Sequence, residues 1–145
     1  SEAELGLRFP VYLVRAGLDP AAGPKPGAVA MLLRDRVPTL VEMADAAHYF
    51  YATVHPSAEL VAELVGEAVR VALSALAARL NAIEWTRDAL GAAMKTEAAA
   101  HGLKPGQVMM AMRVLVCGTR ETPAIDAVLA LLGRERVLER LSANL

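Results

Sequence analysis

The chain has 145 residues, with 15 basic and 16 acidic side chains; 55% of its residues are hydrophobic and only 4% are aromatic. This length suits one domain or two small bundles and is too short for a large enzyme. A single cysteine, Cys117, excludes a disulfide framework and a zinc site built from several cysteines. Charged residues interrupt every apolar run before it reaches membrane-spanning length, so we expect a cytoplasmic protein with no membrane partner.

Charge is unevenly distributed along the chain. Residues 7–36 carry five basic side chains against two acidic ones, and residues 102–145 carry six against four. Residues 37–101 carry eight acidic side chains against four basic ones. Two weakly basic ends therefore flank an acidic middle, which fits either a modest anion-binding surface or ordinary solvated faces.

The first part of the chain is irregular in pattern. Residues 1–27 mix apolar and basic side chains with Pro10 and end in a loop rich in proline and glycine, as expected of a fragment cut from a longer chain. A short apolar helix is predicted over residues 28–33. It ends before Pro38, because the residue before a proline is pushed out of the helical region.

Three helices are predicted from their caps. Thr39, Ser57 and Thr86 each precede a helical pattern, and a hydroxyl at that position accepts a hydrogen bond from the first turn. Thr39 also forms a capping box with Glu42, in which the glutamate reaches back to the threonine amide. The helices run over residues 40–51, 58–83 with a break at Gly66, and 87–101.

The C-terminal part is also predicted to be helical. Residues 108–116 form an apolar helix that ends at Gly118. Thr122 is then expected to cap a helix with Pro123 at its first position, where the missing amide costs nothing. That helix ends at Gly133, and a last helix reaches the C-terminus. We therefore predict an all-α protein of seven or eight short helices in two bundles.

No local motif for catalysis or metal binding occurs. The histidines His48, His55 and His101 lack partners at metal-ligand spacing, so we expect them at the surface or at helix ends. Cys117 lies among apolar residues and is expected to be a small buried hydrophobe. There is no phosphate-binding glycine loop and no nucleophile elbow, so we predict no catalytic residue and no metal site.

Two arginine-bearing segments stand out from this background. Arg34 and Arg36 lie at a corner between two predicted helices. Arg113 is a lone charge in an apolar segment, where an unpaired guanidinium is costly to bury. Arg113 therefore needs a solvent edge or a partner, and an internal acidic side chain is as good an interpretation as a ligand contact.

These segments resemble the C-terminal anticodon-binding region of bacterial glutamyl-tRNA synthetase, a class I aminoacyl-tRNA synthetase. The similarity lies in the order and spacing of motifs from about Leu32 to Leu141. They are Arg34-Asp35-Arg36, Thr39-Leu40, Tyr49-Phe50-Tyr51, Trp85-Thr86, Lys104-Pro105-Gly106-Gln107-Val108, Met112-Arg113-Val114 to Gly118, Thr122-Pro123 and residues 131–141. Class I lysyl-tRNA synthetase carries a related region, so the resemblance indicates a tRNA role more strongly than it indicates the amino acid.

The resemblance implies an all-α fold of two small helical bundles of the α-helix cage type. Residues 1–56 would be the first anticodon-binding subdomain and residues 57–145 the second. It further implies binding to the tRNA(Glu) anticodon loop and attachment to a catalytic domain that uses ATP and magnesium. The ATP-binding signatures of that domain are absent from these residues, so we expect this fragment to hold no cofactor and not to aminoacylate alone.

The resemblance also implies roles for individual residues. Arg36 matches the arginine that reads the third anticodon base in enzymes that reject glutamine tRNA, and Arg34 is a candidate phosphate contact. Cytosine presents two acceptors on its pairing edge whereas guanine presents donors, so an arginine favours cytosine. Further matches give four contacts to splayed bases and one to a phosphate: Arg113, Thr122, Pro123 and Ile125, and Lys95.

One departure and one alternative accompany this interpretation. Ala111 stands where relatives commonly have a proline, two residues before Arg113. The start of the helix before Arg113 therefore departs from the family pattern. An all-α protein-interaction scaffold without nucleic-acid binding is the alternative. The near-neutral net charge favours the scaffold, and the placement of the arginines opposes it.

Overall fold

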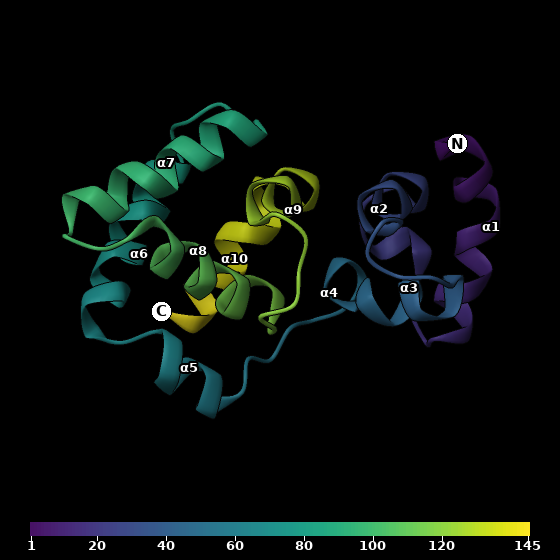
Figure 1. The fold of residues 1–145 in the computed structure, drawn as a ribbon, viewed down its shortest axis with the longest axis horizontal. Coiled ribbons are helices and arrows are strands. Elements are labelled where there is room, and N and C mark those ends of the chain that lie inside the picture. Colours follow the sequence, from purple (N-terminus) through teal and green to yellow (C-terminus); the bar gives the residue numbers. More distant parts are fainter. The chain divides into compact units, whose positions relative to one another are not determined.

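The computed structural model describes residues 1–145, which form helices and short connections without a β-strand (Figure 1). The chain divides into two compact units, Ser1–Thr53 (unit 1) and Val54–Leu145 (unit 2). The all-α prediction is confirmed, but the chain has ten α-helices rather than seven or eight. One additional helix begins the chain, and the stretch predicted over residues 40–51 is interrupted at Ala47.

Unit 1 begins with a helix that the sequence pattern did not predict, α1 (Glu2–Arg15). The Ser1 hydroxyl caps it by accepting a hydrogen bond at 3.3 Å from the amide three residues on. The helix runs through Pro10 and buries Phe9 and Leu13 completely on its inner face. A proline normally disfavours a helix interior, which is why this segment looked irregular.

The next helix, α2 (Pro26–Leu33), crosses α1 at a contact between two glycines. A Cβ atom on Gly27 would lie 2.7 Å from the carbonyl oxygen of Glu2 and 3.3 Å from the Cα of Gly6. Glycine therefore lets the two backbones approach this closely. The helix predicted over residues 28–33 is confirmed and starts two residues earlier, at a proline that needs no amide partner.

Three short elements complete unit 1: η1 (Pro20–Ala22), α3 (Leu40–Ala46) and α4 (His48–Tyr51). Thr39 caps α3 as predicted, because its hydroxyl accepts a hydrogen bond from the Glu42 amide at 3.1 Å. The Glu42 carboxylate accepts from the Thr39 hydroxyl at 3.3 Å, and not from the Thr39 amide as the capping box predicted. The hydroxyl of Tyr51 donates to the Pro24 carbonyl at 2.9 Å and fixes the loop before α2.

Unit 2 contains the remaining six α-helices. Ser57 and Thr86 cap two of them as predicted, with amide-to-hydroxyl distances of 3.1 Å and 3.2 Å. The predicted break at Gly66 separates the first two helices. The helices are α5 (Ala58–Leu64), α6 (Glu67–Leu80), α7 (Arg87–Ala100), α8 (Pro105–Met112), α9 (Ile125–Leu132) and α10 (Arg134–Asn144).

The helix predicted over residues 108–116 is α-helical only as far as Met112. It continues as a π-helical turn, η2 (Arg113–Cys117), in which hydrogen bonds span five residues instead of four. The last four residues of η2 are fully buried. The turn ends at Gly118, as predicted, and the φ of 73° at this residue lies in the left-handed region that favours glycine.

The predicted start of α9 is wrong. The helix begins at Ile125 with Ala124 as its N-cap, and no side chain caps it. The hydroxyl of Thr122 does not cap the helix, because it accepts a hydrogen bond from Arg113 and donates one to the Pro123 carbonyl. A tertiary contact has therefore displaced the local one that the Thr-Pro pattern predicted.

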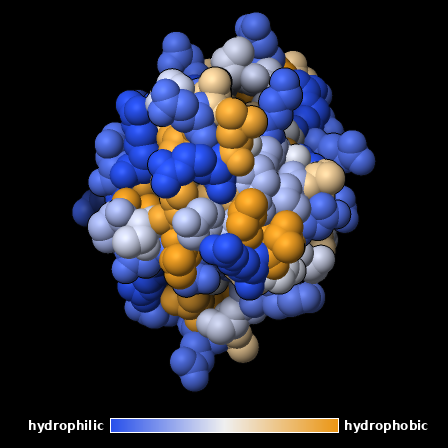
Figure 2. Space-filling view, turned by 90° about the vertical axis from the view of Figure 1, so that its right-hand side faces the viewer, coloured by the Kyte–Doolittle hydropathy of each residue, from blue (hydrophilic) through white to orange (hydrophobic).

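The outer face of α1 carries three exposed apolar side chains. Leu7 is 83% exposed, Val11 51% and Val14 61%. Figure 2 shows the side of the molecule on which α1 lies, where orange hydrophobic groups interrupt a mostly blue, hydrophilic surface. None of the helices combines the length and the apolar character needed to cross a membrane.

Candidate nucleic-acid interface

The first candidate site is the corner between α2 and α3 in unit 1. Arg34 directly follows α2, and the amide of Arg36 donates to the Leu33 carbonyl at 2.9 Å, which fixes the turn. Both arginine side chains are exposed, and neither forms a hydrogen bond or an ion pair. Each guanidinium therefore keeps its charge and all of its donors for a ligand.

The second candidate site surrounds Arg113, the first residue of η2. Its guanidinium is half-buried, and the Nε donates to the Thr122 Oγ1 at 3.0 Å. No acidic side chain pairs with it, so the internal acidic partner considered from the sequence is absent. The Thr122 hydroxyl in turn donates to the Pro123 carbonyl at 2.8 Å. The arginine is held by a neutral group and keeps its positive charge.

The seven predicted contact residues differ in exposure. Arg34, Arg36 and Lys95 are exposed and Arg113 is half-buried. Hydrogen bonds bring Arg113, Thr122 and Pro123 together, whereas Lys95 lies on α7 without a hydrogen bond or ion pair. The other three side chains are buried. They are Pro123, Thr122, which is 6% exposed, and Ile125, which is 2% exposed.

Two side chains of α10, neither of them predicted from the sequence, support η2. Arg140 donates from Nη1 to the Val116 carbonyl at 2.9 Å, and Asn144 donates from Nδ2 to the Leu115 carbonyl at 3.5 Å. Burial lowers the pKa of Arg140. Their spacing of four residues, which places both donors on one helix face, was the available signal.

Cys117 closes the same turn. Burial raises the pKa of its thiol from the ordinary value of 9.0 to about 12, although the charges of Arg140 and Arg113 act in the opposite direction. The side chain is fully buried, which confirms its predicted role as a small hydrophobe. A thiol in this state is neutral at physiological pH and is a poor nucleophile.

Three other arginines of unit 2 are paired with carboxylates. Each of these pairs has one nitrogen-to-oxygen distance within 3.1 Å, so their charges contribute little to an anion-binding surface. The pairs are Arg79 with Glu97 at 2.7 Å, Arg87 with Asp126 at 3.1 Å and Arg120 with Glu63 at 2.5 Å. Arg113 differs from them because its partner carries no charge.

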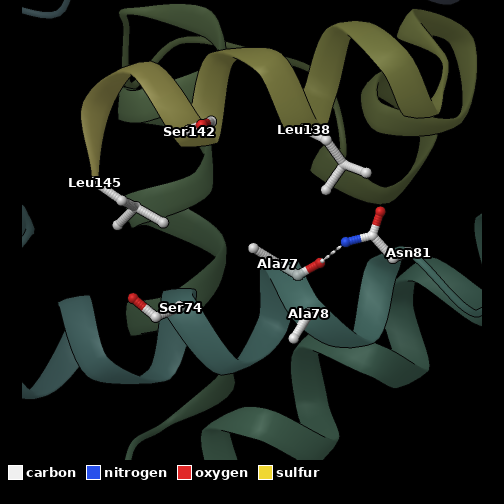
Figure 3. Close-up of a pocket in the computed structure, with 7 residues that line it drawn as sticks. All are labelled: Ser74, Ala77, Ala78, Asn81, Leu138, Ser142 and Leu145. Atoms are coloured by element: carbon white, nitrogen blue, oxygen red, sulfur yellow. Dashed lines mark hydrogen bonds between the residues drawn. The ribbon is translucent and has the colours of Figure 1, made fainter.

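A groove of about 440 Å³ runs between α6 and α10 (Figure 3). Its lining is small or apolar and carries no charge, and the Asn81 amide is already engaged with the Ala77 carbonyl at 3.2 Å. The groove therefore offers no cation to a phosphate. It is lined by Ser74, Ala77, Ala78, Asn81, Leu138, Ser142 and Leu145.

The histidines lie as the sequence predicted. His48 and His55 are exposed, and His101 is half-buried at the C-terminal end of α7. No group of three or more His, Cys, Asp or Glu side chains is placed so that it could hold a metal ion.

Comparison with known proteins places the chain in a family. Residues 11–145 match the family described as anticodon binding domain. The glutamate–tRNA ligase of Thiobacillus denitrificans is 50% identical over 140 residues, which are 97% of this chain and 29% of that protein. The corresponding ligase of Aromatoleum aromaticum is 46% identical over 140 residues, 97% of this chain and 30% of that protein. The chain thus spans less than a third of the length of these relatives.

Two solved structures share the fold. A glutamate tRNA ligase from Elizabethkingia meningosepticum superposes with a TM-score of 0.84 at 15% identity, over 99% of this chain and 28% of that one. A glutamate–tRNA synthetase from Elizabethkingia anophelis gives a TM-score of 0.80 at 14% identity, with the same coverage. Because the family match extends over residues 11–145, the chain belongs to the anticodon binding domain family and is homologous to the corresponding part of glutamate–tRNA ligases.

Proposed function

We propose that this chain reads the anticodon loop of tRNA(Glu) as the C-terminal region of a glutamate–tRNA ligase. The family and the names of the relatives that are 46–50% identical over nearly the whole chain support this role. The observation that carries it is the pair of exposed arginines, Arg34 and Arg36, that no carboxylate neutralises. RNA binding depends on such cations, because they displace the counterions of the phosphate backbone.

In unit 1, Arg36 is the reader of the third anticodon base. Its guanidinium has donors only, so it complements the O2 and N3 acceptors of cytosine and opposes the donors of guanine. By analogy with base-edge contacts in DNA, such a pair discriminates by about 1–3 kcal/mol. Arg34, on the same corner, binds a backbone phosphate, which positions the loop without specifying its sequence.

In unit 2, Arg113 meets a splayed base with the nitrogens that Thr122 leaves unbonded. Pro123 and Ile125 supply the apolar support of this loop, and Lys95 on α7 binds a phosphate. Residues 1–56 are in this proposal the first anticodon-binding subdomain and residues 57–145 the second.

The complete ligase would act in the cytoplasm and use ATP and magnesium in its catalytic domain. The residues present here do not fit those groups, since no carboxylate cluster for a metal and no glycine-rich phosphate loop occurs among them. We therefore assign these residues to tRNA recognition alone and the chemistry to the catalytic domain.

The test is a titration of this chain with two anticodon stem-loops that differ only in the third anticodon base, which is C in one and G in the other. We expect the C loop to bind about tenfold more tightly, and Arg36→Ala to abolish that preference. Affinity should fall steeply between low and moderate salt. The isolated chain lacks the contacts of the rest of the ligase, so full-length tRNA serves as a positive control.

Equal binding of both loops by the unmodified chain would refute base reading by Arg36. Binding that is undetectable or independent of salt, with full-length tRNA as well, would refute the tRNA role altogether. That outcome would leave the protein-interaction scaffold as the remaining interpretation.

A further inference from the structure

The Thr122 hydroxyl makes two hydrogen bonds within the protein. The oxygen accepts from the Arg113 Nε at 3.0 Å, and its single proton is donated to the Pro123 carbonyl at 2.8 Å. The side chain is 6% exposed. A buried hydroxyl with its proton committed has little left to offer a base, although the resemblance assigns Thr122 a base contact.

The contact with Thr122 leaves the rest of Arg113 available. A guanidinium has five N–H groups, and four of them, on Nη1 and Nη2, make no hydrogen bond in the structure. The bond at Nε fixes the plane of the group. Because the partner is a hydroxyl, it orients the guanidinium without cancelling its charge, whereas the carboxylate of Asp126 both orients and neutralises Arg87.

Both partners are held by the backbone around them. Arg113 opens η2, whose later carbonyls accept hydrogen bonds from Arg140 and Asn144 on α10. Two features constrain the loop between η2 and Thr122. Gly118 has a left-handed backbone with a φ of 73°. The Thr119 hydroxyl accepts a hydrogen bond from the Glu121 amide at 3.0 Å. The Thr122 hydroxyl is therefore presented to Arg113 from a constrained loop.

We infer that Thr122 is a positioning residue: its hydroxyl orients the Arg113 guanidinium toward an RNA base and does not itself contact the RNA. This inference rests on the proposed function, because it needs Arg113 to bind the anticodon loop. It changes the role of Thr122 from a direct contact to a determinant of the geometry of Arg113.

The test compares Thr122→Val, Thr122→Ser, Arg113→Ala and the double variant Arg113→Ala/Thr122→Val in stem-loop titrations. Valine keeps the shape and removes the hydroxyl, while serine keeps the hydroxyl. We expect Thr122→Val to weaken binding about three- to tenfold, Thr122→Ser to bind like the unmodified chain, and Thr122→Val to have no further effect once Arg113 is absent.

A readout without RNA tests the geometry by itself. The Arg113 Nε–H resonance should exchange slowly with water in the unmodified chain and in Thr122→Ser, and rapidly in Thr122→Val. The third-base preference of Arg36 should persist in every Thr122 variant, because Arg36 lies in unit 1. Denaturation curves of the same variants check that unit 2 is folded.

Each contrary outcome points to a different failure. An equal loss from Thr122→Val with and without Arg113 would mean that Thr122 contacts the RNA directly and would overturn the inference. A neutral Thr122→Val beside a damaging Arg113→Ala would show that the hydroxyl does not position the arginine. A neutral Arg113→Ala would refute the proposed role of Arg113 itself, and the inference with it.

Discussion

The arginines that we propose as RNA contacts are held differently in the two units. Arg34 and Arg36 extend from an exposed corner with no partner, while Arg113 is half-buried and bonded through Nε to a buried hydroxyl. An unrestrained arginine loses rotamer freedom when it binds, whereas a restrained one has lost part of it on folding. We therefore expect the corner of unit 1 to be adaptable and the site of unit 2 to be preorganised.

Under the proposed function, one residue type would therefore serve two purposes. A flexible guanidinium adapts to a base or a phosphate at an entropic cost on binding. A fixed one gains affinity only for a ligand of the matching shape. The rigidity of the Arg113 site in unit 2 and the specificity of the Arg36 corner in unit 1 can both be measured.

The largest expected effect concerns Cys117, which lies on the same turn as Arg113. If η2 is rigid, a thiol reagent should modify Cys117 in the native chain at least about a thousandfold more slowly than in the unfolded chain. Kinetics of labelling with and without denaturant measure this ratio. Rapid labelling at neutral pH would show that η2 opens readily and that the second site is not preorganised.

The same thiol predicts a pH dependence of stability. Its pKa is about 12 in the folded chain against an ordinary 9.0, so the unfolded chain releases this proton first as the pH rises. The contribution of Cys117 to the free energy of unfolding is therefore complete below pH 9.0 and declines from there to about 12. Denaturation curves across this range should show a decline that Cys117→Ala reduces.

The next effect concerns the chemistry of the corner. Arg36→Lys keeps the charge but removes the planar fork of donors, so we expect the preference for the C loop to fall roughly tenfold. The salt dependence of binding should stay unchanged. Arg34→Lys is the matched control and should leave the preference intact, because a phosphate accepts either cation. A retained preference in Arg36→Lys would show that charge alone suffices.

A smaller effect is expected from the phosphate contacts. Arg34→Ala and Lys95→Ala should each weaken binding of both stem-loops equally, by about two- to threefold at moderate salt. Each should also reduce the slope of log affinity against log salt by about one. Titrations at several salt concentrations measure both quantities. A change in base preference with either variant would contradict the assignment to phosphate.

The smallest effect is expected from an exposed ion pair. Glu63→Gln removes the ion pair between Glu63, whose side chain is 61% exposed, and Arg120, whose side chain is 42% exposed. It should change the free energy of unfolding by under about 1 kcal/mol. Glu97→Gln is the comparison, because Glu97 is 6% exposed and binds Arg79 at 2.7 Å. Denaturant titrations should show a larger loss for Glu97→Gln.

Features set by neighbouring residues could be predicted from the sequence. Thr39, Ser57 and Thr86 cap their helices because each hydroxyl meets an amide three residues away. α1 was missed because Pro10 concealed a helix that Ser1 caps and that packs on α2 through Gly6 and Gly27.

In the candidate sites, too, local features could be predicted from the sequence and tertiary contacts could not. The place of Arg36 at a corner between two helices could be predicted, because Pro38 bounds that corner in the sequence. The role of Thr122 could not be predicted from the sequence, because its local pattern indicates a helix cap. Only the fold brings Arg113 to the Thr122 hydroxyl. The supporting hydrogen bonds from α10 to η2 depend equally on tertiary contact.

The π-helical turn of η2 also affects how related sequences are compared. Such a turn accommodates one residue more than an α-helix would in the same length, so it behaves as a single-residue insertion that the fold has absorbed. A relative with a one-residue gap between 113 and 117 would have a plain α-helix there. Relative to the residues that follow, the arginine of such a protein would be rotated by about 100° around the helix axis, which is the rotation of one helical residue. An arginine aligned with Arg113 in that protein would therefore not be its structural equivalent.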